Sequence, residues 1–365
     1  MLNQSLRTGV RAAGLLFVAL CGEAANAQTI QPPFNANYTY TSLGTPAGVQ
    51  TNFGGVTLKN DDPNVLLLGG GANFSGGAIY AVPLVRDACG QISGFAGPAT
   101  LFATAPNIDG GLCYNDQGIL FATTFSDNQL HQYLPGATSP TRTDSFTALG
   151  MSSSTGSCNF VPAGFGGAGR FKVLIYNSGF FYDVTLTPAG NGTYNLSNPV
   201  LTAASINGGP EGFAYVPAGS PNFPVPSMIV AEWGSGNIAA YEIDGQGNPI
   251  SSTRRLMISG LSGAEGAFID PGTGDFIFAT FGGGNQVVVV RGFAATSDCD
   301  SIDFNNDGSF FDPQDIDAFL SVYSEGPCIP AGATCNDIDF DNNGSCFDPA
   351  DIDTFLRVYS EGPCS

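Results

Sequence analysis

A repeat of about 50 residues constrains the fold of the long first part of the chain. Repeats start near residues 54, 110, 156, 212 and 266, and each carries a glycine-led apolar segment, a hairpin turn and further short strands. The clearest copies are DGGLCY at Asp109, PEGFAY at Pro210 and AEGAFI at Ala264. A period of this size with three to four strands per unit is typical of β-propeller blades. We therefore expect a mainly β fold, with five blades ahead of six, and ahead of a β-sandwich pair or a β-helix.

The two ends of this region are expected to meet. The last repeat ends at Phe293 after three strands, whereas residues 37–43 have strand character but no repeat of their own. Pairing the N-terminal segment with the last repeat would supply a fourth strand and remove exposed sheet edges. The sequence therefore predicts a ring closed by its own N-terminal strand.

Composition excludes two classes of protein. The 50 glycines and 24 prolines, together with many β-branched and aromatic residues, argue against an all-helical fold. The chain has 31 acidic and 11 basic residues and a formal charge of −20. A nucleic-acid-binding protein needs a basic surface to contact phosphates, so that function is excluded.

The N-terminus has the pattern of a secretory signal peptide. Arg7 and Arg11 precede an apolar stretch over residues 12–21, and Ala25-Asn26-Ala27 has the small-x-small form of a cleavage site. We predict a signal peptide over residues 1–27 and a secreted or cell-surface-associated chain from Gln28. A lipoprotein signal ending at Cys21 is the alternative, which Leu20 disfavours. The apolar stretch is too short to cross a bilayer as a helix, and no transmembrane segment is expected elsewhere.

The mature chain divides into two parts of different character. Residues 28–296 form the expected propeller, and a short linker near residues 294–297 leads to a tail over residues 297–365. The tail contains fifteen acidic residues against Arg357 alone, and five of the eight cysteines that follow the signal peptide. An even number of cysteines in an exported chain permits disulfides. Such a dense negative charge, combined with recurring aromatic residues, indicates a bound cation.

The tail contains a duplicated loop with calcium-ligand spacing. The segment from Cys299 to Cys328 recurs from Cys335 to Cys364 at an offset of 36 residues. Each copy has oxygen-bearing side chains at positions 1, 3 and 5 of an EF-hand-type loop, Gly308 or Gly344 at position 6 for the sharp turn, and a serine at position 7, which offers its backbone carbonyl. These residues are Asp303, Asn305, Asp307 and Ser309 in the first copy and Asp339, Asp341, Asn343 and Ser345 in the second. We predict two Ca²⁺ sites.

The residue that closes each loop stays open between two aspartates. Position 12, where a standard loop has its bidentate carboxylate, holds Gln314 or Ala350. Either Asp315 and Asp351 close the loops from position 13, or Asp312 and Asp348 close them from position 10. Asp312 and Asp348 are also followed by proline, as is typical of a helix N-cap. The helices that begin there are expected to bury apolar residues spaced as on one helix face, namely Ile316, Phe319, Leu320 and Tyr323, and Ile352, Phe355, Leu356 and Tyr359.

This duplicated loop-and-helix tail resembles the dockerin domains of bacterial extracellular proteins. Copies that begin with cysteine and end in Gly-Pro-Cys are similar to the GC-type dockerin domain, over residues 299–365. The resemblance implies attachment to a cohesin-like or cell-surface receptor through a calcium-ordered face. The extra loop residue and Asn343 in place of an aspartate depart from the common dockerin pattern.

Spacing alone leaves the disulfide pairing open. A pseudo-twofold arrangement of the two units favours Cys299 with Cys364 and Cys328 with Cys335, and pairing within each repeat is the alternative. Cys346 has no counterpart in the other copy and is either free or paired elsewhere. In the propeller, Cys113 and Cys158 lie in the first strands of adjacent blades, so a bridge between them is possible, with Cys89 as the rival partner.

Three acidic residues are the candidate site of the propeller. Asp109, Glu211 and Glu265 each stand at the start of an innermost strand, where they face the mouth of the central channel. This is weakly similar to gluconolactonase-like and strictosidine-synthase-like propellers, whose acidic residues at that point hold a divalent metal. Three converging carboxylates would need a cation or would titrate upward, whereas dispersed ones would be hydrated surface acids.

Two functions are therefore open, and only the second depends on these three acids. The first is a tethered binding or scaffold protein whose ligand is unknown, and the second is a metal-dependent hydrolase or lactonase. The hydrolase or lactonase function requires that the three carboxylates lie within roughly 5–6 Å of one another, as around a metal ion. Catalysis by a histidine-activated nucleophile and a histidine zinc site are disfavoured, because His131, the single histidine, lies in a strand-like segment.

Overall fold

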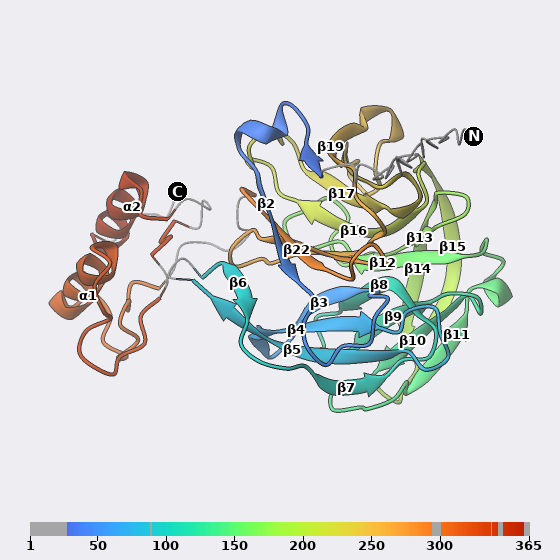
Figure 1. Ribbon diagram of the computed structural model, residues 1–365, viewed down its shortest axis with the longest axis horizontal. Helices are drawn as coiled ribbons and strands as arrows, with labels where there is room; N and C mark the ends of the chain where they lie inside the picture. Colours follow the sequence, from blue (N-terminus) through green and yellow to red (C-terminus); the bar gives the residue numbers. More distant parts are fainter. Residues whose placement is uncertain (1–27, 88–89, 294–300, 337, 342–345, 361–365) are drawn as a thin grey trace, which may run out of the picture.

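The computed structural model describes residues 28–87, 90–293, 301–336, 338–341 and 346–360. Its main part is a ring of five antiparallel sheets, so the prediction of a mainly β, five-bladed propeller is confirmed. Figure 1 shows these sheets arranged around a centre, with the two helices of the tail at one side. None of the described helices is long and apolar enough to cross a membrane.

Each blade begins with its innermost strand. Blade 1 contains β3 (Val56–Lys59), β4 (Asp62–Gly70), β5 (Ala78–Arg86), β6 (Ile92–Phe95) and β7 (Thr100–Thr104). Blade 2 contains β8 (Ile108–Tyr114), β9 (Leu120–Thr124), β10 (Gln129–Tyr133) and β11 (Arg142–Ser145). Blade 3 contains β12 (Thr155–Phe160), β13 (Phe171–Ile175), β14 (Phe180–Pro188) and β15 (Tyr194–Ser205). Blade 4 contains β16 (Pro210–Val216), β17 (Ser227–Glu232), β18 (Asn237–Glu242), β19 (Arg255–Ser259) and the N-terminal β1 (Thr29–Ile30). Blade 5 contains β20 (Ala264–Ile269), β21 (Phe276–Thr280), β22 (Val287–Arg291) and β2 (Thr39–Gly44).

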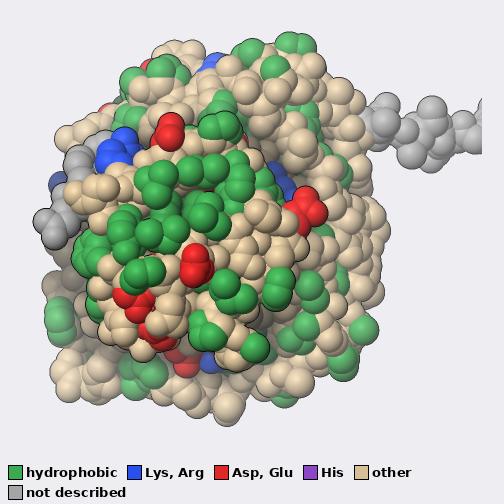
Figure 2. Space-filling model, turned by 90° about the vertical axis from the view of Figure 1, so that its left-hand side faces the viewer, with side chains coloured by type: hydrophobic (Ala, Val, Ile, Leu, Met, Phe, Trp, Pro, Cys, Tyr) green, Lys and Arg blue, Asp and Glu red, His purple; other side chains and the backbone are tan. Residues whose placement is uncertain are grey.

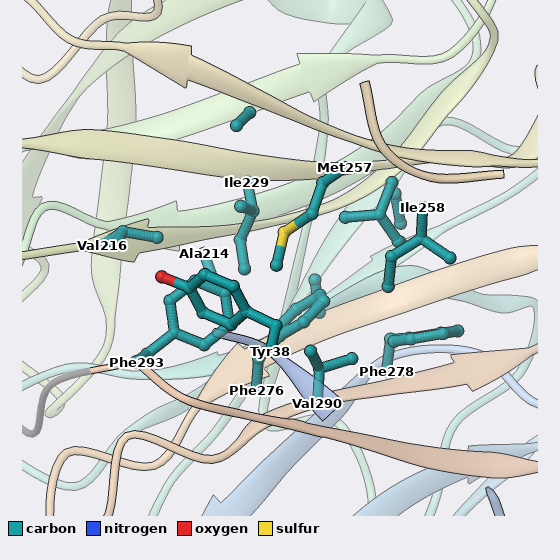
Figure 3. Close-up of a cluster of buried hydrophobic side chains, with 14 of the residues drawn as sticks. Tyr38, Ala214, Val216, Ile229, Met257, Ile258, Phe276, Phe278, Val290 and Phe293 are labelled. Carbon is teal, nitrogen blue, oxygen red and sulfur yellow. The ribbon is translucent and has the colours of Figure 1, made fainter. Parts of the chain in front are cut away.

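The ring closes as the sequence predicts. Strand β2 pairs antiparallel with β22, so the N-terminal segment supplies the outer strand of the last blade. Its neighbours Phe34 and Tyr38 are buried in the apolar cluster between blades 4 and 5, and Figure 3 shows Tyr38 packed beside Phe293, Phe276 and Val290. The Tyr38 hydroxyl also donates a hydrogen bond to the Pro221 carbonyl at 2.6 Å. Burial of large apolar side chains, each contributing about 1.5–3 kcal/mol, holds this segment in place.

Ion pairs join the last blade to the first. Arg86 at the end of β5 pairs with Asp270 at 2.8 Å, and Arg291 of β22 pairs with Asp87 at 3.2 Å. The Asp275 carboxylate accepts a hydrogen bond from the Ile92 N–H at 2.7 Å. Charged groups that are largely buried in this way are stabilising only when paired, and here each contact crosses the seam of the ring.

Two hairpin turns of the propeller contain an asparagine in the left-handed backbone conformation. Asn128 and Asn285 have φ values of 54° and 49°, in the left-handed region that asparagine tolerates. The Asn128 side chain accepts a hydrogen bond from the Thr155 N–H at 3.0 Å, and Asn285 accepts one from the Asn52 N–H at 2.6 Å. These two turns thus also link neighbouring blades. In the turn before β18, Gly236 rather than Asn237 adopts the positive φ, at 67°.

The tail folds around two helices related by the sequence repeat. Helices α1 (Pro313–Tyr323) and α2 (Pro349–Tyr359) each begin after an aspartate N-cap. The rings of Phe319 and Phe355 stack at 4.1 Å between the helices. The Tyr323 hydroxyl donates to the Phe347 carbonyl at 3.0 Å, and the Tyr359 hydroxyl donates to the Phe311 carbonyl at 2.9 Å. Each helix thus closes on the loop of the other copy.

One expectation about these helices is wrong. Leu320 and Leu356 are not buried, because 47% of each is exposed. The stacked phenylalanines turn toward the partner helix, so the residues that follow them on the helix face solvent. Phe319 and Phe355 are buried as expected, and four of the other predicted residues are partly buried against them: Ile316, Tyr323, Ile352 and Tyr359. The helices also bury Asp315 and Ala318 in α1 and Asp351 and Thr354 in α2.

One disulfide whose partners both lie in the described part of the tail joins the two copies. Cys328 bonds to Cys335, which rules out pairing within each repeat. Cys346 is disulfide-bonded and therefore not free. Cys299, Cys364 and Cys89 lie outside the described residues. In the propeller, the Cys113 and Cys158 sulfurs face each other at 3.7 Å as free thiols, so the possible bridge between them is not formed in this structure.

Candidate functional site

The innermost strands approach one another so closely that only glycine fits at one level of the channel. An added Cβ at Gly110 would lie 1.9 Å from the Glu211 carbonyl oxygen, and at Gly212 it would lie 2.3 Å from the Glu265 oxygen. At Gly156 the distance to the Pro210 oxygen would be 2.3 Å, and at Gly266 the distance to the Gly55 Cα would be 2.6 Å. Glycine is the residue that permits such backbone contact. The residues directly before these glycines therefore also stand close together around the channel.

Three of those preceding residues are acids, and they converge. Ligand atoms of Asp109 in β8, Glu211 in β16 and Glu265 in β20 all lie within 4.8 Å of one another. Only 0%, 6% and 1% of these three residues is exposed. None of the ion pairs found in the described part of the chain involves them. The three acids, named below the channel triad, are thus neither dispersed nor neutralised by arginine.

The channel triad is electrostatically uncompensated. Both carboxylate oxygens of Asp109 and Oε2 of Glu211 are buried without a hydrogen-bond partner. Burial raises the pKa of Asp109 well above its usual range, the nearby Gly110 N–H lowers it by a smaller amount, and the Asp127 charge raises it further. Burial and the Asp109 charge likewise raise the pKa of Glu211 and of Glu265, and Glu265 raises that of Glu211 further. The cluster is therefore stable only with bound protons or a cation.

The separation of these carboxylates suits a hard divalent ion. An ion at the centre of a triangle with 4.8 Å sides lies about 2.8 Å from each corner, and closer for a smaller triangle. Calcium–oxygen distances are about 2.3–2.6 Å and magnesium–oxygen distances about 2.0–2.1 Å, so a small inward movement of the side chains would bring all three oxygens to bonding distance of either ion. Unpartnered carboxylate oxygens are the ligands that such ions prefer. The residues present fit a divalent cation.

Aromatic side chains stand above the channel triad. Tyr176, Trp233 and Phe281 each follow the second strand of a blade, in blades 3, 4 and 5. The Tyr176 and Trp233 ring centres are 6.0 Å apart, and those of Trp233 and Phe281 are 6.3 Å apart. The pKa of Tyr176 is raised by burial and then by the charges of Glu211, Glu265 and Asp109, which places this ring near all three acids. We name these three residues the aromatic arc.

The sequence contained a signal for the aromatic arc that the prediction did not use. An aromatic residue recurs after the second strand of four repeats, as Phe125, Tyr176, Trp233 and Phe281. Aromatic residues at such positions more often belong to a hydrophobic core. That they lie together at the channel follows only from the arrangement of the strands around it.

In the second tail loop, three predicted ligands come together. Ligand atoms of Asp339, Asp341 and Asp351 lie within 4.8 Å of one another. The Asp351 Oδ1 atom is buried without a hydrogen-bond partner. Burial, followed by the charges of Asp339, Asp348 and Asp341, raises the pKa of Asp351 to about 7. Asn343 and Ser345 lie outside the described residues.

In the first loop, the predicted ligands accept hydrogen bonds from the loop's own backbone. The Asp303 carboxylate accepts hydrogen bonds from the Asp307 N–H at 3.0 Å and the Gly308 N–H at 2.9 Å. Asn305 Oδ1 accepts a further bond from the Asp307 N–H at 3.0 Å, and Ser309 is exposed. Asp315 accepts from the Phe304 N–H at 2.9 Å and the Asp312 N–H at 3.2 Å. Among the described residues, the aspartates of this loop, Asp303, Asp307 and Asp315, do not form a cluster within 4.8 Å like that of the second loop.

The two candidate closing residues have different positions. Asp312 and Asp348 cap their helices, each accepting bonds from the second and third residues of the helix. Asp315 and Asp351 are buried and face the loops, and Asp351 belongs to the acidic cluster. The geometry thus favours position 13 over position 10 as the closing position.

His131 contributes to the core of its blade. It lies in β10, 5% of it is exposed, and its Nδ1 atom is 3.4 Å from the Tyr133 hydroxyl. Burial lowers its pKa. It lines neither the channel triad nor the tail loops, as expected for an ordinary strand residue.

Comparisons with known proteins give weak similarities to propellers. No family model and no curated protein matches the chain. Among solved structures, the pyranose dehydrogenase PQQ domain of Coprinopsis cinerea is 10% identical over 73% of this chain and 97% of its own, with a TM-score of 0.41. Glutaminyl cyclase of Myxococcus xanthus is 11% identical over 70% of this chain and 96% of its own, with a TM-score of 0.42. An auxiliary nutrient binding protein of Bacteroides ovatus is 11% identical over 70% and 76%, with a TM-score of 0.40. Similarities this low carry no argument about function.

Proposed function

We propose that the chain is an exported binding protein that is attached to a surface or to an extracellular complex by a Ca²⁺-ordered, dockerin-like tail. Its propeller would hold a ligand at the channel mouth that bears the channel triad and the aromatic arc. The single observation that carries the proposal is the convergence of Asp339, Asp341 and Asp351 with an unpartnered Asp351 oxygen. Carboxylates gathered in this way are stabilised by a cation, and the loop spacing is that of a calcium site.

Two features of the chain support export. The N-terminal pattern ending at Ala27 is that of a secretory signal, and the tail contains a disulfide between Cys328 and Cys335. Disulfides persist mainly in oxidising compartments outside the cytosol.

The tail also offers an apolar surface for a protein receptor. Leu320 and Leu356 occupy equivalent places in the two copies, and Phe310 and Phe311 are 62% and 46% exposed. Figure 2 shows hydrophobic side chains gathered on this end of the molecule, with acidic side chains around them. An apolar patch with a polar border is typical of a protein–protein contact. We assign it to the cohesin-like or cell-surface receptor.

Calcium binding is tested by replacing the closing residue of each loop. In the full chain, Asp351→Asn is expected to weaken one Ca²⁺ site at least tenfold, about 1.4 kcal/mol, and Asp315→Asn the other. Asparagine keeps the size of the side chain and one accepting oxygen but loses the charge and the second accepting oxygen. Isothermal titration calorimetry gives the number of sites and their affinities.

Exposed aspartates two residues further along provide matched controls. Asp353→Asn and Asp317→Asn remove the same charge from the helix surface and should leave both affinities within a factor of two or so. Equal weakening by all four variants would mean that the tail attracts Ca²⁺ only through its general charge, and the loop sites would be rejected.

Attachment is tested on the apolar surface. Leu320→Asp with Leu356→Asp is expected to abolish Ca²⁺-dependent binding to a cohesin domain, while both calcium affinities remain. Surface plasmon resonance, with and without chelator, measures the loss. Unchanged binding by the double variant, or binding that ignores the chelator, would contradict docking through this surface.

The channel triad favours a second candidate function, a metal-dependent hydrolase or lactonase. Its specific observation is that Asp109, Glu211 and Glu265 converge within 4.8 Å rather than pairing with arginine. A divalent ion there would polarise a substrate carbonyl or activate water. The chain's own carboxylates would hold the ion, and the aromatic arc would restrict access to it.

A further inference from the structure

The channel has a second mouth, away from the channel triad, that opens into a cavity of about 650 Å³. The cavity is lined by residues at the far ends of all five innermost strands, among them Lys59, Tyr114, Asn159, Tyr215 and Ile269. In β8, Asp109 stands second and Tyr114 last, so the two levels are separated by about 16 Å at about 3.3 Å per residue. The acids do not line this cavity, which is therefore a separate site.

The walls of the cavity are largely aromatic and apolar. Tyr114, Phe165, Tyr215 and Phe268 come from blades 2, 3, 4 and 5, and Leu58 of β3 adds an aliphatic side chain from blade 1. Small-molecule sites are typically apolar cavities of about 300–1,000 Å³ with a few polar groups. Both the size and the lining match that description.

The cavity is preformed. Tyr215 donates a hydrogen bond to the Gly247 carbonyl at 2.9 Å, and its ring packs against Phe165 with centres 5.6 Å apart. The Asn159 side-chain amide donates to the Phe213 carbonyl at 3.3 Å. Because these side chains are fixed by the strands and turns around them, little ordering would be needed when a ligand binds.

The charges around the cavity are already compensated within the protein. Lys59 forms an ion pair with Asp61, and Asp270 pairs with Arg86 at 2.8 Å. No other lysine, arginine, aspartate or glutamate lines the cavity among the described residues. A charged ligand would have to break one of these pairs, whereas an uncharged one would not.

We infer that this second mouth is a binding site for an uncharged, flat aromatic molecule. Its rings would lie against the aromatic walls, where stacked or edge-to-face contacts add to the burial of apolar surface. Asn159 and Asn60 would accept or donate hydrogen bonds at the rim. The inference is independent of calcium binding by the tail and of any cation in the channel triad.

The test uses the neutral fluorescent probe N-phenyl-1-naphthylamine and a variant that covers the cavity mouth. Gly272 lines the cavity at its exposed rim, and an added Cβ there would meet only Asp270 Oδ1, at 3.5 Å. Gly272→Phe should therefore fold normally and place a ring over the mouth. We expect saturable, blue-shifted fluorescence with the full chain and at least tenfold weaker binding with Gly272→Phe.

Gly76→Phe is the matched control. Gly76 is an exposed turn glycine between β4 and β5, at the opposite end of the blades, with no heavy atom within 4 Å of an added Cβ. It should bind the probe as the unaltered chain does. Circular dichroism melts confirm that both variants are folded.

Two results would overturn the inference. One is equal probe binding by Gly272→Phe and the unaltered chain. The other is a signal that disappears in the Leu320→Asp and Leu356→Asp variant instead, because the probe would then occupy the apolar surface of the tail.

Discussion

Replacing Glu211 with glutamine is expected to stabilise the metal-free propeller and to abolish its stabilisation by a divalent cation. The variant removes one of three buried, uncompensated carboxylates, and relief of such a group is worth about 1–3 kcal/mol. At a concentration 100 times the Kd, a cation stabilises the unaltered chain by about 2.7 kcal/mol, and Glu211→Gln should lose this gain. Thermal melts at pH 7, with chelator and with Ca²⁺ or Mg²⁺, measure both effects.

The same variant should flatten the pH dependence of the metal-free chain. The folded-state pKa values of Asp109, Glu211 and Glu265 are raised, so the folded state binds protons more tightly than the unfolded state. The contribution of these three acids to the free energy of unfolding is therefore fully present below the usual carboxylate pKa. It is lost as the pH rises through the raised pKa values. Denaturant titrations from pH 4 to pH 8 would show a shallower decline for Glu211→Gln.

Glu242→Gln, at the C-terminal end of β18, serves as the control for Glu211→Gln. It should change neither the metal-free stability nor the response to cations. If Glu211→Gln also destabilises the metal-free chain, the triad is not an uncompensated cluster. Hydrolysis of a panel of lactones by the metal-loaded chain, lost in Glu211→Gln, would establish the enzymatic function; no turnover with bound metal would leave the binding function.

Gly110→Ala is expected to destabilise the propeller by at least about 3 kcal/mol. Its Cβ would lie 1.9 Å from the Glu211 carbonyl oxygen, so a backbone contact between two innermost strands would have to open. Overpacking typically costs about 1–3 kcal/mol, and a clash with backbone belongs at the upper end or beyond. Urea denaturation of the full chain measures the loss.

Gly94→Ala makes the same chemical change where there is room. No heavy atom lies within 4 Å of a Cβ at Gly94 in β6, so the free energy of unfolding should change by less than about 1 kcal/mol. Similar values for Gly94→Ala and Gly110→Ala would show that the innermost strands can separate without penalty.

The blade pattern was predictable because it is local and repeated. Each repeat places a glycine at the start of an innermost strand, and the five starts near residues 54, 110, 156, 212 and 266 match β3, β8, β12, β16 and β20. The closing strand was predictable because one strand-like segment had no partner. Their equal positions in strands that share a channel made the three acids candidates, but the sequence left open whether they converge or are dispersed.

Other features depend on distances that spacing does not encode. The exposure of Leu320 and Leu356 depends on the angle at which the helices pack, since a helical stripe of apolar residues is wider than the contact it makes. The aromatic arc and the second-mouth cavity arise from residues of several blades. The pairing of Cys328 with Cys335 was one of two open arrangements, and only the relative placement of the copies decides between them.

The seam between β2 and β22 also governs when the propeller can become complete. Strand β2 is synthesised before the innermost strand of every blade and must wait, without its partner β22, until nearly all of the propeller has been synthesised. Contacts between distant parts of a chain form slowly, and an unpaired strand is open to association with other chains. During synthesis the chain is therefore open to aggregation until β2 pairs with β22.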